Sequence, residues 1–166
     1  MKKVLIIVLL TTFNVIAQKK EPQKLKVSGA VENSMALSID DLKTKKVVSG
    51  KAFKIVSLEG QVKKTIAAFR GVALKSLLDE AKILITNPKE KGQFYVSVVG
   101  NDGQKVIFSW SELYNGTTGD KALILFEDNG RPIAKDGPFS LITTADIFTE
   151  TRYVRSVKSI EVGKIQ

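Results

Sequence analysis

Short apolar runs separated by turn-forming residues fill the chain from Leu25 onward. Most of these runs have the length of a strand, and several alternate apolar with polar positions, which is typical of a sheet with one buried face. The run at 155–162 shows this alternation clearly at its end. The predicted strands are residues 25–29, 51–58, 61–69, 93–99, 104–109, 121–127, 139–144 and 155–162.

Three segments carry helix signals instead. Ser38 precedes Asp41, and Ser109 precedes Glu112, at the spacing of a capping box, so a short helix is predicted after each serine. We expect Asn115-Gly116 to end the second of these helices. The segment 73–83 repeats apolar residues at helical spacing and predicts an amphipathic helix packed on the sheet. Its apolar positions are Leu74, Leu77, Leu78 and Ala81.

The turns between these elements favour one fold class. Asn101-Asp102-Gly103 lies between two predicted strands and is a hairpin signal. Asp128-Asn129-Gly130 predicts another turn, and residues 87–92 a surface loop. Many short strands with about three short helices indicate an α+β fold with mostly antiparallel pairing. A parallel Rossmann sheet is not expected, because strands and helices do not alternate regularly.

The first residues have the layout of a secretory signal peptide. Two lysines precede an apolar run from Val4 to Leu10, and the pattern favours cleavage after Ala17. An uncleaved anchor is the alternative, but the run is shorter than the roughly 20 residues of a spanning helix. We therefore expect an exported protein, periplasmic or secreted, without a membrane span after cleavage. The expected divisions are a signal peptide at 1–17, a polar leader at 18–24 and one domain at 25–166.

Composition narrows the chemistry. The chain has no cysteine and no histidine. Catalytic triads that need either residue are excluded, and so are the usual zinc, copper and thiolate-bound iron sites. A carboxylate pair for hydrolysis, drawn from Glu59, Asp102 and Asp136, stays open because nothing in the sequence shows that these side chains converge.

The net charge of +9 favours anionic partners. Nucleic acid is not expected, since the lysines are scattered and no nucleic-acid reading motif is present. Two segments are candidates for an anion site. Residues 57–72 combine a glycine turn with Lys63, Lys64 and Arg70, although strand alternation would allow at most one of the two lysines to point inward. Residues 128–140 combine turn residues with Arg131, Lys135 and Ser140, and backbone N–H groups in such turns can form an anion-binding nest. A solvated connection between two strands is the alternative for this segment.

Five segments, taken in order, resemble the molybdopterin-binding oxidoreductase domain, the sulfite-oxidase-like family, in its small exported form. The resemblance covers residues 25–162. It implies a β-rich α+β fold with a β-grasp-like portion. The segments are LKVSGAVENSMALSIDDL, FRGVALKSLLDEA, NDGQKVIFSWSEL, GRPIAKDGPFSLI and RYVRSVKSIEV.

The resemblance also shows where this chain departs from the family pattern. Family enzymes place a molybdenum-ligating cysteine between the second strand and the segment F-x-G-V-x-L. In this chain the position of that cysteine falls around residues 57–59, where there is no thiol. The family's G-P-x-R reads Gly137-Pro138-Phe139-Ser140, and its D-G-Y reads Asp102-Gly103-Gln104. Three functional signatures of the family have changed, while the structural ones remain.

These departures lead to a binding function as the first hypothesis. We interpret the chain as a protein that binds a molybdopterin-type pterin or another small anion, with no metal expected and no redox turnover. Two alternatives stay open: an interaction module that docks an acidic exported protein, and a molybdenum oxidoreductase with an atypical metal ligand. The candidate cofactor-binding residues are Ser57, Glu59, Gly60, Lys63, Arg70, Asp102, Arg131 and Ser140.

Overall fold

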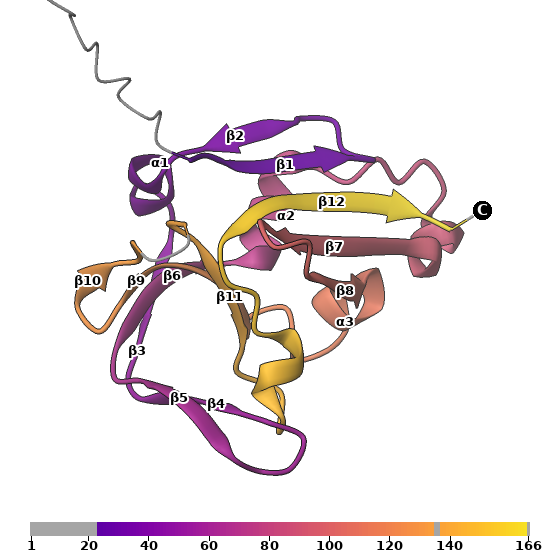
Figure 1. Cartoon of the computed structure of the whole chain (residues 1–166). Coiled ribbons are helices and arrows are strands. Elements are labelled where there is room, and N and C mark those ends of the chain that lie inside the picture. The colour runs from indigo at the N-terminus through magenta and orange to yellow at the C-terminus, as the bar shows by residue number, and fades with distance from the viewer. Residues whose placement is uncertain (1–22, 135–136, 166) are drawn as a thin grey trace, which may run out of the picture.

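The computed structural model describes residues 23–134 and 137–165. The expected signal peptide and most of the expected leader lie outside these residues. Within them the strands form two larger sheets and a separate hairpin, with short helices at their margins (Figure 1). The β-rich α+β fold expected from the sequence is confirmed.

The first sheet has the order β2-β1-β12-β7-β8. Strand β1 pairs in parallel with β12, and the other neighbours in this sheet are antiparallel. The predicted hairpin at 101–103 is confirmed as the connection from β7 to β8. The strands are β1 (Leu25–Gly29), β2 (Met35–Leu37), β7 (Phe94–Gly100), β8 (Lys105–Ser109) and β12 (Val157–Lys164).

The second sheet has β9 at its centre. Strand β9 pairs with β6, β10 and β11, and β6 pairs in turn with β3, all antiparallel. The strands are β3 (Val47–Gly50), β6 (Phe69–Ala73), β9 (Ala122–Asp128), β10 (Arg131–Pro132) and β11 (Ser140–Thr143). The third unit is the hairpin of β4 (Phe53–Val56) and β5 (Val62–Ile66), which extends along the lower side of the molecule in Figure 1.

Both predicted capping boxes are present. Ser38 and Asp41 bond reciprocally at the start of α1, and Ser109 and Glu112 do so at the start of α3. Helix α3 ends before Asn115, as predicted. The helices are α1 (Ile39–Lys43), α2 (Leu74–Ala81) and α3 (Trp110–Tyr114), with 3-10 turns η1 (Pro88–Gln93) and η2 (Thr149–Arg152).

The apolar face of α2 lies in the main core. The four apolar positions predicted for this helix are fully buried, and they pack with residues of both larger sheets. A smaller core of six buried residues joins the β4–β5 hairpin to the second sheet through Ile55, Ile66 and Phe69. The hairpin is therefore fixed to the body of the molecule by one face.

The prediction of one strand at 61–69 is wrong. The chain breaks at Ala67-Ala68, so that β5 belongs to the hairpin and β6 to the second sheet. Asn129 explains the break, because its Oδ1 accepts a hydrogen bond from the Ala67 N–H at 2.6 Å and its own N–H donates to the Ala68 carbonyl at 2.7 Å. These bonds satisfy the backbone at the point where it changes sheets.

Among the described residues, helices are too short and too polar to cross a membrane.

Candidate functional site

A basic cavity of about 720 Å³ lies between the β4–β5 hairpin, the β9–β10 turn, the start of β11 and the segment from η2 to β12. A volume of this size is typical of a small-molecule site. Segments far apart in the sequence meet here, since the lining comes from β5, the β7–β8 turn, the β9–β10 turn and the segment from η2 to β12. The lining residues with polar side chains are Lys63, Lys64, Gln104, Asp128, Arg131, Ser140, Glu150, Tyr153, Arg155 and Ser156.

Both lysines of the hairpin line the cavity, so the prediction that at most one points inward is wrong. The cause is a bulge in the hairpin. Ile55 pairs with Lys64, but Val56 pairs with Val62, which leaves Lys63 as an extra residue. An extra residue interrupts the alternation of faces that a regular strand would impose.

Lys64 joins the hairpin to the opposite wall of the cavity. Its Nζ donates to Asp128 Oδ2 at 2.9 Å and to the Tyr153 hydroxyl at 3.4 Å. Burial works against the charge of Lys64, but these bonds outweigh it and raise the pKa of the ammonium group above its ordinary value. Lys64 is thus a permanent cation at neutral pH.

Ser156 is the most constrained residue of the lining. Only 5% of it is exposed, and its hydroxyl has no hydrogen-bond partner among the described residues. Its backbone φ of +51° lies in the left-handed region, which a serine rarely adopts. Gly137 stands beside it: a Cβ at Gly137 would lie 3.1 Å from the Ser156 Oγ. A glycine therefore keeps room around this hydroxyl.

The structure brings three of the sequence-predicted site residues to the cavity: Lys63, Arg131 and Ser140. Arg131 comes from the two-residue strand β10, and Ser140 is the first residue of β11. Their role in binding stays a prediction. Lys135 and Asp136 lie outside the described residues.

The turn at Ser57, Glu59 and Gly60 is the tip of the hairpin and is not part of the described cavity lining. The turn closes on itself, since the Ser57 N–H donates to the Gln61 carbonyl and the Gly60 N–H donates to the Ser57 carbonyl, each at 2.9 Å. The Ser57 hydroxyl accepts from the Gln61 N–H at 3.4 Å. A hydrogen bond from Ser57 also holds the pKa of the Glu59 carboxyl below its ordinary value.

Two further predicted residues have partners outside the cavity. Arg70 on β6 donates to Glu127 at 3.2 Å and lies over the ring of Phe126. Asp102 accepts from the backbone N–H of Gln104 at 3.0 Å, which stabilises the β7–β8 turn. The neighbouring Gln104 is the residue of this turn that lines the cavity, and its amide donates to the Tyr153 carbonyl at 3.1 Å.

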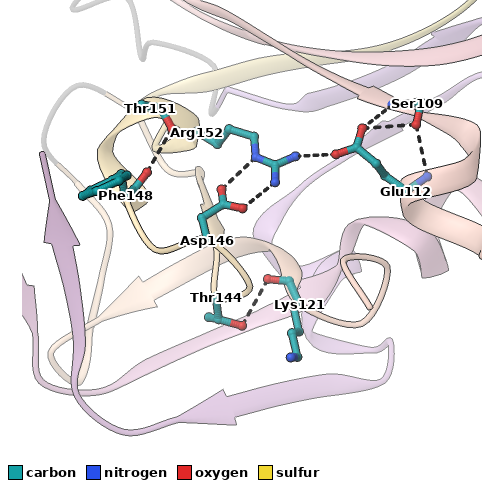
Figure 2. A network of polar contacts seen from close by, with 8 residues as sticks. All are labelled: Ser109, Glu112, Lys121, Thr144, Asp146, Phe148, Thr151 and Arg152. Carbon is teal, nitrogen blue, oxygen red and sulfur yellow. Dashed lines mark hydrogen bonds and ion pairs between the residues drawn. The ribbon is translucent and has the colours of Figure 1, made fainter. Parts of the chain in front are cut away.

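A polar network holds the η2 wall in place (Figure 2). Arg152 donates to Asp146 through Nε at 2.7 Å and also through Nη2, and it reaches Glu112 on α3 through Nη1 at 3.0 Å. Its guanidinium also lies over the ring of Phe108, 4.8 Å from the centroid. Two residues next to this network line the cavity: Glu150, within η2, and Tyr153, which directly follows η2.

The donor set of the cavity fits an organic anion better than a metal. The lining offers lysine and arginine cations and serine hydroxyls. The chain contains no cysteine, and the described residues contain no group of three or more His, Cys, Asp or Glu side chains that would hold a metal ion. A protein thiolate for molybdenum is therefore absent from this sequence, and the described carboxylates do not gather to replace it.

Sequence reasoning did not name six polar residues of the lining as binding residues: Gln104, Asp128, Glu150, Tyr153, Arg155 and Ser156. Three of these lie in RYVRSVKSIEV, one of the five segments that carry the family resemblance. That segment was a usable signal. No local pattern marked Glu150, which reaches the cavity only because η2 folds against the hairpin.

Comparisons with known proteins give the family and the fold of the chain. A family model described as the oxidoreductase molybdopterin binding domain matches residues 13–165. Among 27 matching chains of solved structures is the crystal structure of the sulfane dehydrogenase SoxCD from Paracoccus pantotrophus. It superposes with a TM-score of 0.61 over 84% of this chain at 18% identity, which shows a shared fold, and this chain spans only 38% of that one. No curated protein sequence matches the chain significantly.

Proposed function

This chain belongs to the family of oxidoreductase molybdopterin-binding domains, and from that premise we propose that its basic cavity binds a phosphate-bearing pterin or a similar small anion without thiolate-bound molybdenum. Membership confirms the resemblance carried by the five sequence segments. The proposal concerns binding alone, and no redox step is assigned to the residues of the cavity.

The charges of the cavity support an anionic ligand. Lys63, Lys64, Arg131 and Arg155 outnumber the carboxylates of Asp128 and Glu150 in the lining. A phosphate group about 4 Å from one cation gains about 4 kcal/mol at an effective dielectric constant near 20, before the cost of desolvation. Arg131 and Arg155 have exposed side chains, so they are free to move toward a ligand.

The observation that carries the proposal is the buried hydroxyl of Ser156. A buried polar group without a partner costs about 1–3 kcal/mol, so native structures rarely keep one. Here Ser156 is among the residues that line a cavity rich in cations, and its shielded hydroxyl lies beside a glycine that leaves it room. A phosphate oxygen would accept the hydrogen bond that Ser156 lacks, while the neighbouring Arg155 would neutralise its charge.

The heterocycle of a pterin offers N–H donors and ring acceptors to the remaining lining. Asp128 and Glu150 carry acceptor oxygens, and Gln104 carries both an acceptor and donors. A ligand with an anionic group and several N–H donors would find partners for both in this lining. The cations, acceptors and donors of the lining together support a role in binding the ligand.

The test is to purify the full chain from a host that makes molybdopterin and to measure released pterin by fluorescence after oxidation. Molybdenum and tungsten are measured by mass spectrometry on the same sample. We expect pterin without a stoichiometric metal. An Arg131→Glu variant should lose at least tenfold of the bound pterin, because it replaces a phosphate contact by a repulsion, whereas Lys89→Glu, an exposed lysine of η1, changes the net charge equally and should keep it.

Two results would reject the proposal. Well-folded protein with neither pterin nor metal would show that the cavity does not bind a pterin. Metal together with pterin would favour the oxidoreductase alternative, with a metal ligand other than cysteine. The interaction-module alternative has support of its own in the open edge of the hairpin, described next.

A further inference from the structure

The hairpin that forms one wall of the cavity has one closed and one open edge. On the outer side of β4, the Val56 N–H donates to Thr149 Oγ1 at 2.8 Å, and the Thr149 hydroxyl donates to the Lys54 carbonyl at 2.7 Å. Segment η2 thus satisfies this edge. Strand β5 pairs with β4 alone among the described strands, and four of its five residues are exposed. Its outer backbone groups are available to another strand.

Exposed apolar side chains gather at the tip of the same hairpin. Leu58 is 64% exposed, and Val62 is 52% exposed. The loop before η2 adds Ile147 at 83% and Phe148 at 40%. Val62 pairs with Val56, and Val56 bonds to Thr149, the residue after Phe148, so these side chains lie at one end of the hairpin. Clustered exposed apolar residues of this kind mark interaction sites.

The positive charge of β5 favours an acidic partner over a second copy of this chain. Lys63 and Lys64 stand side by side in the strand, in a chain of net charge +9. Antiparallel pairing of β5 with a second copy of itself would set lysines opposite lysines, and like charges directly opposite are destabilising. Carboxylates on an added strand would instead form favourable cross-strand pairs.

From these observations we propose that β5 is a docking edge for an extended, acidic segment of a partner protein. The segment adds to β5 as a further strand, so that main-chain hydrogen bonds supply affinity and side chains supply specificity. Its carboxylates lie beside Lys63, while Lys64 keeps its bond to Asp128. An apolar residue near one end of the segment packs on Leu58 and Val62. The proposal does not depend on a ligand in the cavity.

The probe is a synthetic peptide of alternating glutamate and valine, added to the full chain. Hydrogen exchange followed by mass spectrometry reads the β5 amides, and fluorescence anisotropy of the labelled peptide reads affinity. We expect at least threefold slower exchange in β5 and weaker binding at high salt. Val62→Asp should weaken binding about tenfold while leaving the cavity lysines intact, and the distant Lys89→Glu should stay within twofold.

Two control peptides separate strand addition from general attraction. A peptide with alternate backbone N-methyl groups should not protect β5, and a lysine–valine peptide should not bind. The proposal is overturned if β5 stays unprotected at millimolar peptide, if either control binds as well as the probe, or if protection rises with protein concentration alone, which would assign the edge to a second copy.

Discussion

Arg152 and Glu112 are 40 residues apart in the sequence, and the Arg152 Nη1 lies 3.0 Å from the Glu112 Oε1. The same carboxylate caps α3 through the backbone N–H of Ser109 at 2.8 Å. The Arg152 side chain therefore links a helix start to η2 (Figure 2). Glu150 in η2 and Tyr153, the residue after it, both line the cavity. The positions of these two lining residues depend on contacts outside the cavity.

Replacing Arg152 by methionine should destabilise the fold by about 2–3 kcal/mol, because it removes the partner of two partly buried carboxylates. Urea unfolding followed by the fluorescence of Trp110, the single tryptophan, measures the change. Trp110 stacks on Tyr114 at 4.8 Å, so unfolding alters its environment. Arg70→Met breaks a more exposed pair and should cost less than about 1 kcal/mol. Equal losses in the two variants would show that Arg152 is an ordinary surface cation.

The network should also make the protein sensitive to acid. Burial disfavours the charged form of Glu112, but bonds from Ser109 and Arg152 outweigh it and lower the pKa of the carboxyl below its ordinary value of 4.5. A lowered folded-state pKa gives stability that is present above pH 4.5 and is lost as the pH falls through the folded value. Thermal unfolding from pH 7 to pH 3 should show this loss. Glu112→Gln should lower stability at pH 7 and flatten the profile; an unchanged slope would contradict the assignment.

Replacing Ser156 by glycine should stabilise the fold and weaken ligand binding. Ser156→Gly removes the cost of a side chain at φ +51°, so the free energy of unfolding should rise by about 1 kcal/mol. The same change removes the hydroxyl proposed to meet the ligand, so retained pterin should fall severalfold. Lys82→Gly is the matched control, since Lys82 also has a left-handed backbone, at φ 56°, but is not among the residues that line the cavity. It should leave pterin content unchanged, and an equal loss in both variants would remove Ser156 from the site.

Restoring a thiol at the place suggested by the family pattern should not restore a metal. The Ser57 side chain is buried at the hairpin tip and bonds within its own turn. Ser57→Cys should therefore fold and carry no more molybdenum than the parent chain, measured by mass spectrometry after expression in a host that makes the cofactor. A stoichiometric gain of molybdenum would show that the turn opens toward the cavity.

The export expected from the sequence has a direct test. Expression of the full chain in a secreting host should yield a protein whose mass corresponds to a start at Gln18, with material in the exported fraction. Replacing Lys2 and Lys3 by glutamate should reduce export, because a signal peptide needs a positive first region. An uncut chain held in the membrane fraction would favour the anchor alternative.

Local rules predicted the elements whose signals lie within a few residues. The capping boxes at Ser38 and Ser109 depend on side chains three positions away, and the buried stripe of α2 depends on helical spacing. The short strands β2, β3 and β10 carry little pattern of their own and exist through pairing with β1, β6 and β9 respectively. The break before β6 depends on Asn129, which no window around residue 67 contains.

The site was predictable to the extent that charge and turn chemistry mark it. Arg131 and Ser140 stand near turn residues and were found, whereas Glu150 and Ser156 gain their positions from the packing of η2 and the start of β12. The bulge at Lys63 shows the same limit, since alternation along one strand does not reveal that its partner is one residue shorter.

The parallel pairing of β1 with β12 has a consequence for the order of folding. Strand β12 lies between β1 and β7, so the interior of the first sheet is filled by the last strand that the structure describes. Contacts of such long sequence separation slow folding, since the chain must close a large loop before the sheet is complete. A nascent chain that stops before Val157 keeps β1 and β7 as separate edges, so the first sheet cannot close until β12 is in place between them.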